Sequence, residues 1–131
     1  MTLAGHSPAC FVCGLLGIEV RVAGGRAEAE LLLDDRFTGP PPYAHGGAIS
    51  AFFDEVMGAA VHDRAEAAMT AHLEVDFRRP WPVGEPARMT AQARALGDRK
   101  LLVTGELTDR AGELLAEARG LWVVPRGPRR A

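Results

Sequence analysis

The chain has 131 residues, of which 47% are hydrophobic, a length and an apolar content that fit one folded domain, residues 1–131, with a core of its own. Its formal net charge of −2 gives no sign of the basic footprint of nucleic-acid binding proteins, so we expect no nucleic-acid partner. No run of about 18 apolar residues and no signal-type leader is present, so we expect no membrane partner and a cytoplasmic location.

The N-terminal segment, residues 1–14, is predicted to be a turn region that holds both cysteines. They stand in the order Cys10-Phe11-Val12-Cys13. A structural zinc site needs four ligands, and no second cysteine pair or paired histidines follow. A redox dithiol would precede a helix, whereas the segment after Cys13 has the pattern of a strand. We therefore favour two reduced thiols, and we predict no metal and no cofactor.

The first regular structure predicted is a β-hairpin. Apolar and polar residues alternate over 18–22 and again over 27–33, and Gly24-Gly25 between them supplies a turn that tolerates positive φ. Residues 35–44, which contain three consecutive prolines, are expected to form a rigid loop that leads into the next element.

One long helix is predicted from residue 46 to about residue 62. Apolar residues recur there at i, i+3, i+4 and i+7, which is typical of a helix with a broad buried stripe. The stripe consists of Ile49, Phe52, Phe53, Val56, Met57, Ala60 and Val61. This helix is the largest apolar element in the chain.

Four more alternating stretches follow the helix, over 72–78, 87–95, 100–108 and 114–124. Patterns of period 2 with short turns are typical of an antiparallel sheet with one apolar face. Many residues on that face are alanine or glycine, so the helix can approach closely. We therefore predict an α+β fold, in which a curved antiparallel sheet of five to six strands wraps around one long central helix. Residues 125–131 are expected to be a flexible tail.

The start of the helix combines free backbone donors with the glycine pair Gly46-Gly47, which follows His45. The first N–H groups of a helix have no partner within it and carry a partial positive charge. A carbonyl oxygen placed there would be polarised, and an oxyanion would be stabilised. The alternative is that the glycines only permit a tight turn.

Asp54 places a carboxylate in the middle of this apolar helix, which is costly unless the group is paired or used. It lies on a face of small residues that includes Ser50 and Gly58, so a ligand can approach closely. From Gly46 to Asp54 is eight residues, or about 12 Å along a helix. One carbonyl group cannot touch both ends of that span within one chain. Two antiparallel copies of the helix would solve this, so we predict a shared site at a two-fold dimer interface.

The stretch His45-Gly46-Gly47-Ala48-Ile49 with Asp54, followed by the run from Met69 to Pro80, resembles the hotdog-fold acyl-CoA thioesterases of the PaaI-like group. The opening Cys10-Phe11-Val12-Cys13-Gly14 also recurs there, and the resemblance covers nearly the whole chain. It implies the hotdog fold and hydrolysis of an acyl-CoA thioester to a free acid and CoA. It also implies a homodimer or a homotetramer built as a dimer of dimers, with sites between subunits.

By this resemblance Asp54 is the catalytic carboxylate, acting as general base or as nucleophile. Gly46 is the main-chain donor to the thioester oxygen, His45 orients the turn, and Thr70 positions the attacking water. Strand parity, however, places Thr70 on the side of His72, away from the apolar face, so its approach to the site requires a local bend. The helix residues expected to contact substrate are Gly47, Ser50, Phe53 and Met57.

One position departs from the family pattern. Related enzymes often carry Asn or Gln six residues before the histidine as a second oxyanion contact, and this chain has Gly39 there. Either that donor is missing or a backbone group replaces it. A non-catalytic acyl-CoA or acyl-ligand binding protein on the same fold is therefore the alternative function. The segments Arg78-Arg79 and Arg99-Lys100 either meet the CoA phosphates or are solvated charge. The identity of the acyl group stays open.

Overall fold

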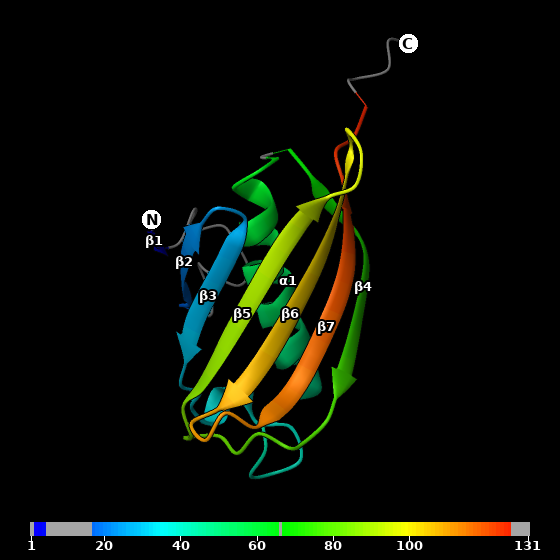
Figure 1. The fold of residues 1–131 in the computed structure, drawn as a ribbon. Coiled ribbons are helices and arrows are strands. Elements are labelled where there is room, and N and C mark those ends of the chain that lie inside the picture. The colour runs from blue at the N-terminus through cyan, green and yellow to red at the C-terminus, as the bar shows by residue number, and fades with distance from the viewer. Residues whose placement is uncertain (1, 5–16, 66, 127–131) are drawn as a thin grey trace.

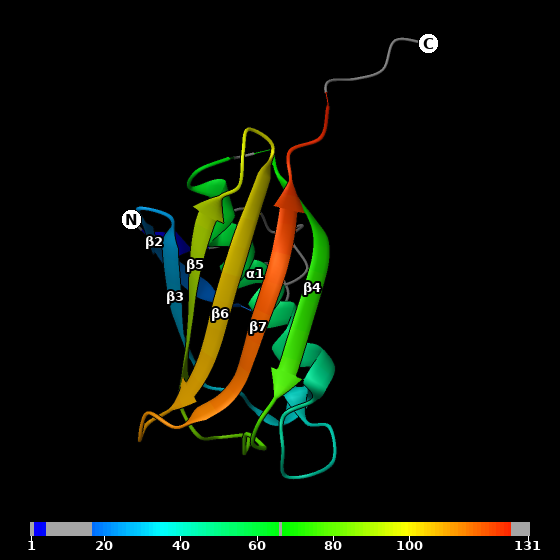
Figure 2. The same ribbon diagram turned by 45° about the vertical axis from the view of Figure 1, so that its right-hand side comes forward.

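A long helix, α1 (Gly46–His62), packs against the concave face of one antiparallel sheet in the computed structural model, which describes residues 2–4, 17–65 and 67–126 (Figures 1 and 2). The strands follow the order β1-β2-β3-β5-β6-β7-β4. Their bounds are β1 Thr2–Ala4, β2 Glu19–Ala23, β3 Arg26–Leu31, β4 Met69–Phe77, β5 Ala87–Ala95, β6 Lys100–Asp109 and β7 Leu114–Val123. The predicted architecture is confirmed.

The six predicted strands correspond to β2–β7, and the short strand β1 adds a seventh that the sequence did not predict. β1 pairs antiparallel with β2 and lies within the segment that was predicted to be a turn region. Three residues are too few for an alternating pattern to be recognised. Cys10, Cys13 and the end of the predicted tail, 127–131, lie outside the described residues. The loop 35–44 contains a 3₁₀ turn, η2 (Asp35–Phe37).

The core lies between α1 and the sheet. All seven residues of the predicted helix stripe are buried there, as are most inward residues of the strands other than β4. Leu73 and Val75 of β4 are only partly buried. A glycine on β6 sets the distance between the layers, because a Cβ atom on Gly105 would lie only 3.0 Å from Cδ1 of Phe53 and 3.2 Å from Sδ of Met57. The expected close approach of helix and sheet is therefore confirmed at this contact.

β4 is the last strand in the sheet order, so only one of its edges is paired, with β7 (Figure 2). Two large apolar side chains at its ends are unusually exposed, Met69 at 66% and Phe77 at 53%. An open strand edge with apolar neighbours is a surface suited to pairing with another chain. No helix among the described residues is long and apolar enough to span a membrane.

Candidate active site

His45 caps the start of α1. Its backbone is extended, and its Nδ1 atom accepts a hydrogen bond from the N–H of Gly47 at 2.8 Å. Because Nδ1 accepts, the neutral ring carries its proton on Nε2. The His45 N–H donates to the carbonyl oxygen of Phe37 at 2.7 Å, which fixes the loop against η2. Within the described chain the N–H of Gly46 donates to no acceptor, so it stays available to a ligand.

Gly39 lies directly against the cap. A Cβ atom on Gly39 would lie 2.9 Å from the Cα atom of His45, a distance that real Cβ atoms essentially never show. The Gly39 N–H is also occupied, since it donates to the carbonyl oxygen of Tyr43 at 2.9 Å. In this loop conformation no Asn or Gln side chain fits at residue 39. A second oxyanion donor, if one is used, must come from elsewhere.

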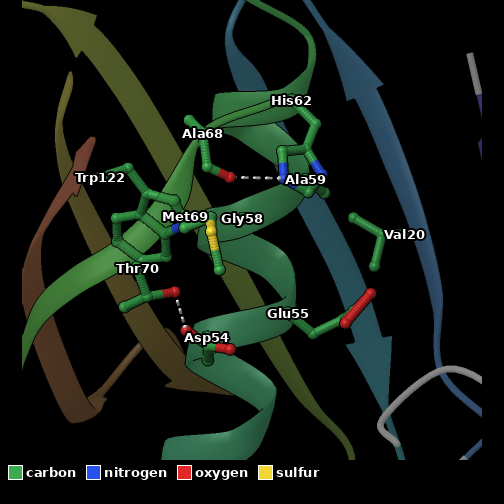
Figure 3. Close-up of a pocket in the computed structure, with 10 residues that line it drawn as sticks. All are labelled: Val20, Asp54, Glu55, Gly58, Ala59, His62, Ala68, Met69, Thr70 and Trp122. Carbon is green, nitrogen blue, oxygen red and sulfur yellow. Dashed lines mark hydrogen bonds between the residues drawn. The ribbon is translucent and has the colours of Figure 1, made fainter. Parts of the chain in front are cut away.

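Asp54 and Thr70 are brought together by the packing of α1 against β4. The Thr70 hydroxyl donates to Oδ1 of Asp54 at 2.8 Å, and the Asp54 side chain is only partly buried (Figure 3). This contact leaves the other carboxylate oxygen, Oδ2, for a further hydrogen bond. The pair thus presents a carboxylate held in one orientation and still open to a ligand or to water.

A β-bulge explains how Thr70 reaches the helix. Thr70 pairs with Trp122 and His72 pairs with Leu121, so Ala71 is an extra residue with no partner on β7. One extra residue reverses the parity of the strand on its N-terminal side. Thr70 therefore shares the helix-facing side with Trp122, which is buried. The bend that the sequence required for Thr70 is this bulge.

A groove of about 280 Å³ extends from the Asp54–Thr70 pair along α1 toward the helix C-terminus (Figure 3). Its floor comes from α1, and its walls come from β2, from the start of β4 and from β7. The lining residues are Val20, Asp54, Glu55, Gly58, Ala59, His62, Ala68, Met69, Thr70 and Trp122. At the far end, His62 Nε2 lies 3.2 Å from the carbonyl oxygen of Ala68.

The residues predicted to contact substrate divide into two groups. Phe53 and Met57 are fully buried in the core against β6 and do not line the groove, so the structure places them as packing residues. Both residues belong to the predicted buried stripe of the helix, so the sequence pattern already indicated that they face the core. Ser50 is half-buried and donates to the carbonyl oxygen of Gly46 at 3.0 Å, and Gly47 is exposed at the helix start.

Trp122, Met69 and His62 line the groove and were not predicted as site residues. The alternation of β7 indicates only that Trp122 faces inward, and no local signal places it beside Asp54. The arginines after β4 are engaged with acidic neighbours. Arg78 pairs with Glu117 at 2.6 Å, and Arg79 pairs with Glu113 at 3.3 Å. This pairing favours solvated charge over a dedicated phosphate site.

No group of three metal-ligating side chains comes together among the described residues. One pKa shift on β4 is at Glu74 on the outer face of the sheet. Hydrogen bonds from His72 and from Arg119 lower the pKa of its carboxyl group. This group lies on the side of the sheet opposite the groove.

Comparison with known proteins gives a consistent picture. A model of the thioesterase superfamily matches residues 42–116, which include the helix start, Asp54 and Thr70. Acyl-coenzyme A thioesterase THEM4 of Xenopus laevis is 29% identical over 86 residues, a match that covers 65% of this chain and 39% of that protein. The chain therefore spans well under half the length of this relative.

Solved structures with the same fold include the following two. A putative thioesterase from Ralstonia eutropha JMP134, described as phenylacetic acid degradation-related, is 29% identical with a TM-score of 0.79, and the match covers 92% of this chain and 94% of that one. The E. coli PaaI protein from the phenylacetic acid degradation operon is 24% identical with a TM-score of 0.76, covering 83% and 84%. The second likeness is evidence for the fold alone.

Proposed function

Since the chain belongs to the thioesterase superfamily, whose model matches more than half of its length, we propose that it hydrolyses an acyl-CoA thioester to a free acid and CoA. The observation that carries this proposal is the Asp54–Thr70 hydrogen bond of 2.8 Å at one end of the groove. A half-buried carboxylate held by one oxygen is suited to accept a proton from water through the other.

In the proposed reaction Asp54 takes a proton from a water molecule, and the resulting hydroxide attacks the thioester carbonyl carbon. The tetrahedral intermediate collapses by breaking the C–S bond, and the proton passes to the CoA thiolate. Thr70 keeps Asp54 in one rotamer during these steps. The alternative is direct attack by Asp54, which forms an anhydride that water then hydrolyses. After a single turnover in ¹⁸O-labelled water, label in the Asp54 carboxylate identifies the anhydride route with water attacking the Asp54 carbonyl carbon, because the general-base route never labels Asp54.

Stabilisation of the oxyanion is assigned to the N–H of Gly46, which has no acceptor among the described residues. One donor of this kind contributes on the order of 3 kcal/mol to transition-state binding. Within one chain this group lies about 12 Å along the helix from Asp54. The proposed site therefore joins Asp54 and Thr70 of one subunit to Gly46 of a second.

The open edge of β4 supports such an arrangement. Pairing of two β4 strands about a two-fold axis would cover Met69 and Phe77, and Phe77 already lies against Gly46, where a Cβ atom would be 3.4 Å from its Cζ atom. We propose a homodimer, which a homotetramer would contain twice. Sedimentation equilibrium with activity measured over the same concentrations tests this, and a fully active monomer would overturn it.

The second candidate is a non-catalytic acyl-CoA or acyl-ligand binding protein. The exclusion of any side chain at Gly39 favours it, because one oxyanion contact of related enzymes has no counterpart there. The experiment is thiol release from acetyl-, phenylacetyl-, hexanoyl-, decanoyl- and palmitoyl-CoA. We expect turnover on part of this panel and a loss of at least about a hundredfold in kcat with Asp54→Asn.

The matched control is Glu106→Gln, which removes one exposed carboxylate from the outer face of β6. It should leave turnover unchanged. Acyl-CoA binding without turnover on any thioester would favour the binding protein. Near-full turnover in Asp54→Asn would remove Asp54 from the mechanism. The cytoplasmic location stays a prediction.

A further inference from the structure

The groove beside Asp54 continues over the small residues of α1. Gly58 lies four residues after Asp54, which is about 6 Å along the helix axis, and Ala59 and His62 extend the floor beyond it. A Cβ atom on Gly58 would meet nothing nearer than 3.8 Å, so space remains above this position. When the carbonyl carbon of a bound thioester lies at the Asp54 carboxylate, the acyl chain runs from there along this floor.

Trp122 closes the wall of the groove at the level of Gly58 (Figure 3). It is only 2% exposed, and the atom nearest to a Cβ on Gly58 is its ring nitrogen Nε1. No acceptor for this N–H is present among the described residues. The second tryptophan differs, because Trp81 is equally buried and donates from Nε1 to the carbonyl oxygen of Glu85 at 2.8 Å. A buried indole N–H normally finds a partner. No fully buried side-chain nitrogen or oxygen among the described residues lacks a partner, so the unpartnered Nε1 of Trp122 is open to the groove.

We propose that Trp122 is a specificity-determining residue of the groove, and that its N–H donates to an oxygen on the acyl group of the substrate. This inference rests on the proposed thioesterase function. An extended chain advances about 3.5 Å over three bonds, so 6 Å corresponds to about five bonds. The substrate class is therefore an acyl-CoA whose acyl group carries a hydroxyl or carbonyl oxygen about five bonds from the thioester carbon.

The position of Trp122 in the sheet supports this assignment. Trp122 on β7 is the direct cross-strand partner of Thr70 on β4, and both face α1. The donor that would recognise the acyl oxygen and the hydroxyl that holds Asp54 therefore belong to one rigid pair of strands. A substrate oxygen bound at Nε1 would fix the acyl group relative to the carboxylate.

The test compares two thioesters that differ by one oxygen, hexanoyl-CoA and 5-oxohexanoyl-CoA. A net hydrogen bond of this kind should favour the oxo compound by about threefold to tenfold in kcat/KM. In Trp122→Phe, which keeps an aromatic ring and removes the N–H, the two values should become equal. The comparison is the ratio of the two kcat/KM values within each enzyme, so a change common to both thioesters does not affect it, and a thermal melt reports whether the variant folds.

A second variant leaves the indole of Trp122 in place. Gly58→Ala places a methyl group in ordinary contact with Nε1, and alanine is favoured over glycine within a helix, so this variant should fold at least as well as the wild type. The methyl group separates the ring nitrogen from the ligand, so the preference for the oxo compound should fall here too.

Equal kcat/KM for both thioesters in the wild type would overturn the inference while leaving the proposed function intact. A preference that persists in both variants would overturn it as well. Failure to hydrolyse these two thioesters, together with the rest of the acyl-CoA panel, would count against the proposed function. In that case calorimetric titration of the two thioesters decides the inference, because equal affinities would refute it.

Discussion

Replacement of Thr70 by valine removes one hydroxyl and keeps the branched shape of the side chain. In the structure this hydroxyl donates to Oδ1 of Asp54 at 2.8 Å. Hydrogen bonds to charged groups contribute about 1.5–3 kcal/mol. Because the Thr70 residue is exposed, the lower end of that range applies, and about 1.4 kcal/mol corresponds to a factor of ten. We expect kcat/KM to fall about tenfold in Thr70→Val and by less than threefold in Thr70→Ser.

The assay is thiol release under initial-rate conditions on whichever acyl-CoA the panel identifies. If Thr70 acts by orienting Asp54, its replacement should matter little once Asp54 is already asparagine, so Thr70→Val in that background should change the residual rate by less than about twofold. If Thr70→Val lowers the rate by the same factor in the Asp54→Asn background as in the wild type, Thr70 acts independently of Asp54. A Thr70→Val enzyme with wild-type kcat/KM and an unchanged melting temperature would refute the reasoning altogether.

Two further predictions concern stability and pH. His45→Ala removes the acceptor for the Gly47 N–H and should lower the free energy of unfolding by about 1 kcal/mol, whereas His45→Asn should keep most of that stability. Chemical denaturation measures both variants. Equal losses of stability in the two would contradict a capping role for the His45 side chain. The Glu74 carboxyl, whose pKa hydrogen bonds from His72 and Arg119 lower, should titrate by NMR below an ordinary glutamate and move upward in Arg119→Gln. Since its folded pKa is depressed, its small contribution to stability exists above the unfolded pKa and is lost as the pH falls through the folded value.

The architecture was predictable because the buried faces of strands and helices require apolar residues at regular spacings along the chain. Alternation marked six strands, and a stripe at helical spacing marked α1, since each residue either faces the core or faces water. The turn at Gly24-Gly25 was equally local, and both glycines adopt positive φ, 60° and 76°. The pattern also contained the reason for close packing, since the alanine and glycine residues of the strands lie where the helix approaches.

Only the tertiary structure decided how the site is built. Strand parity put Thr70 on the wrong side of β4, because a bulge of one extra residue, Ala71, is invisible to a count of alternating positions. Phe53 was assigned both to the buried helix stripe and to the substrate, and the packing of α1 against β6 places it in the core. The contact between Trp122 and Gly58 joins residues 64 positions apart, and no local pattern encodes it.

The sequence by itself therefore determined the elements, their inward faces and the candidate carboxylate Asp54, since these depend on the polarity of each residue and its near neighbours. Only the folded chain placed the hydroxyl of Thr70 on Asp54, closed the space at Gly39 and left the Trp122 N–H without an acceptor among the described residues. Those features depend on strand register and on distances of a few ångströms between segments far apart in the chain, which hydrogen bonding between strands and close packing fix only when the whole domain assembles.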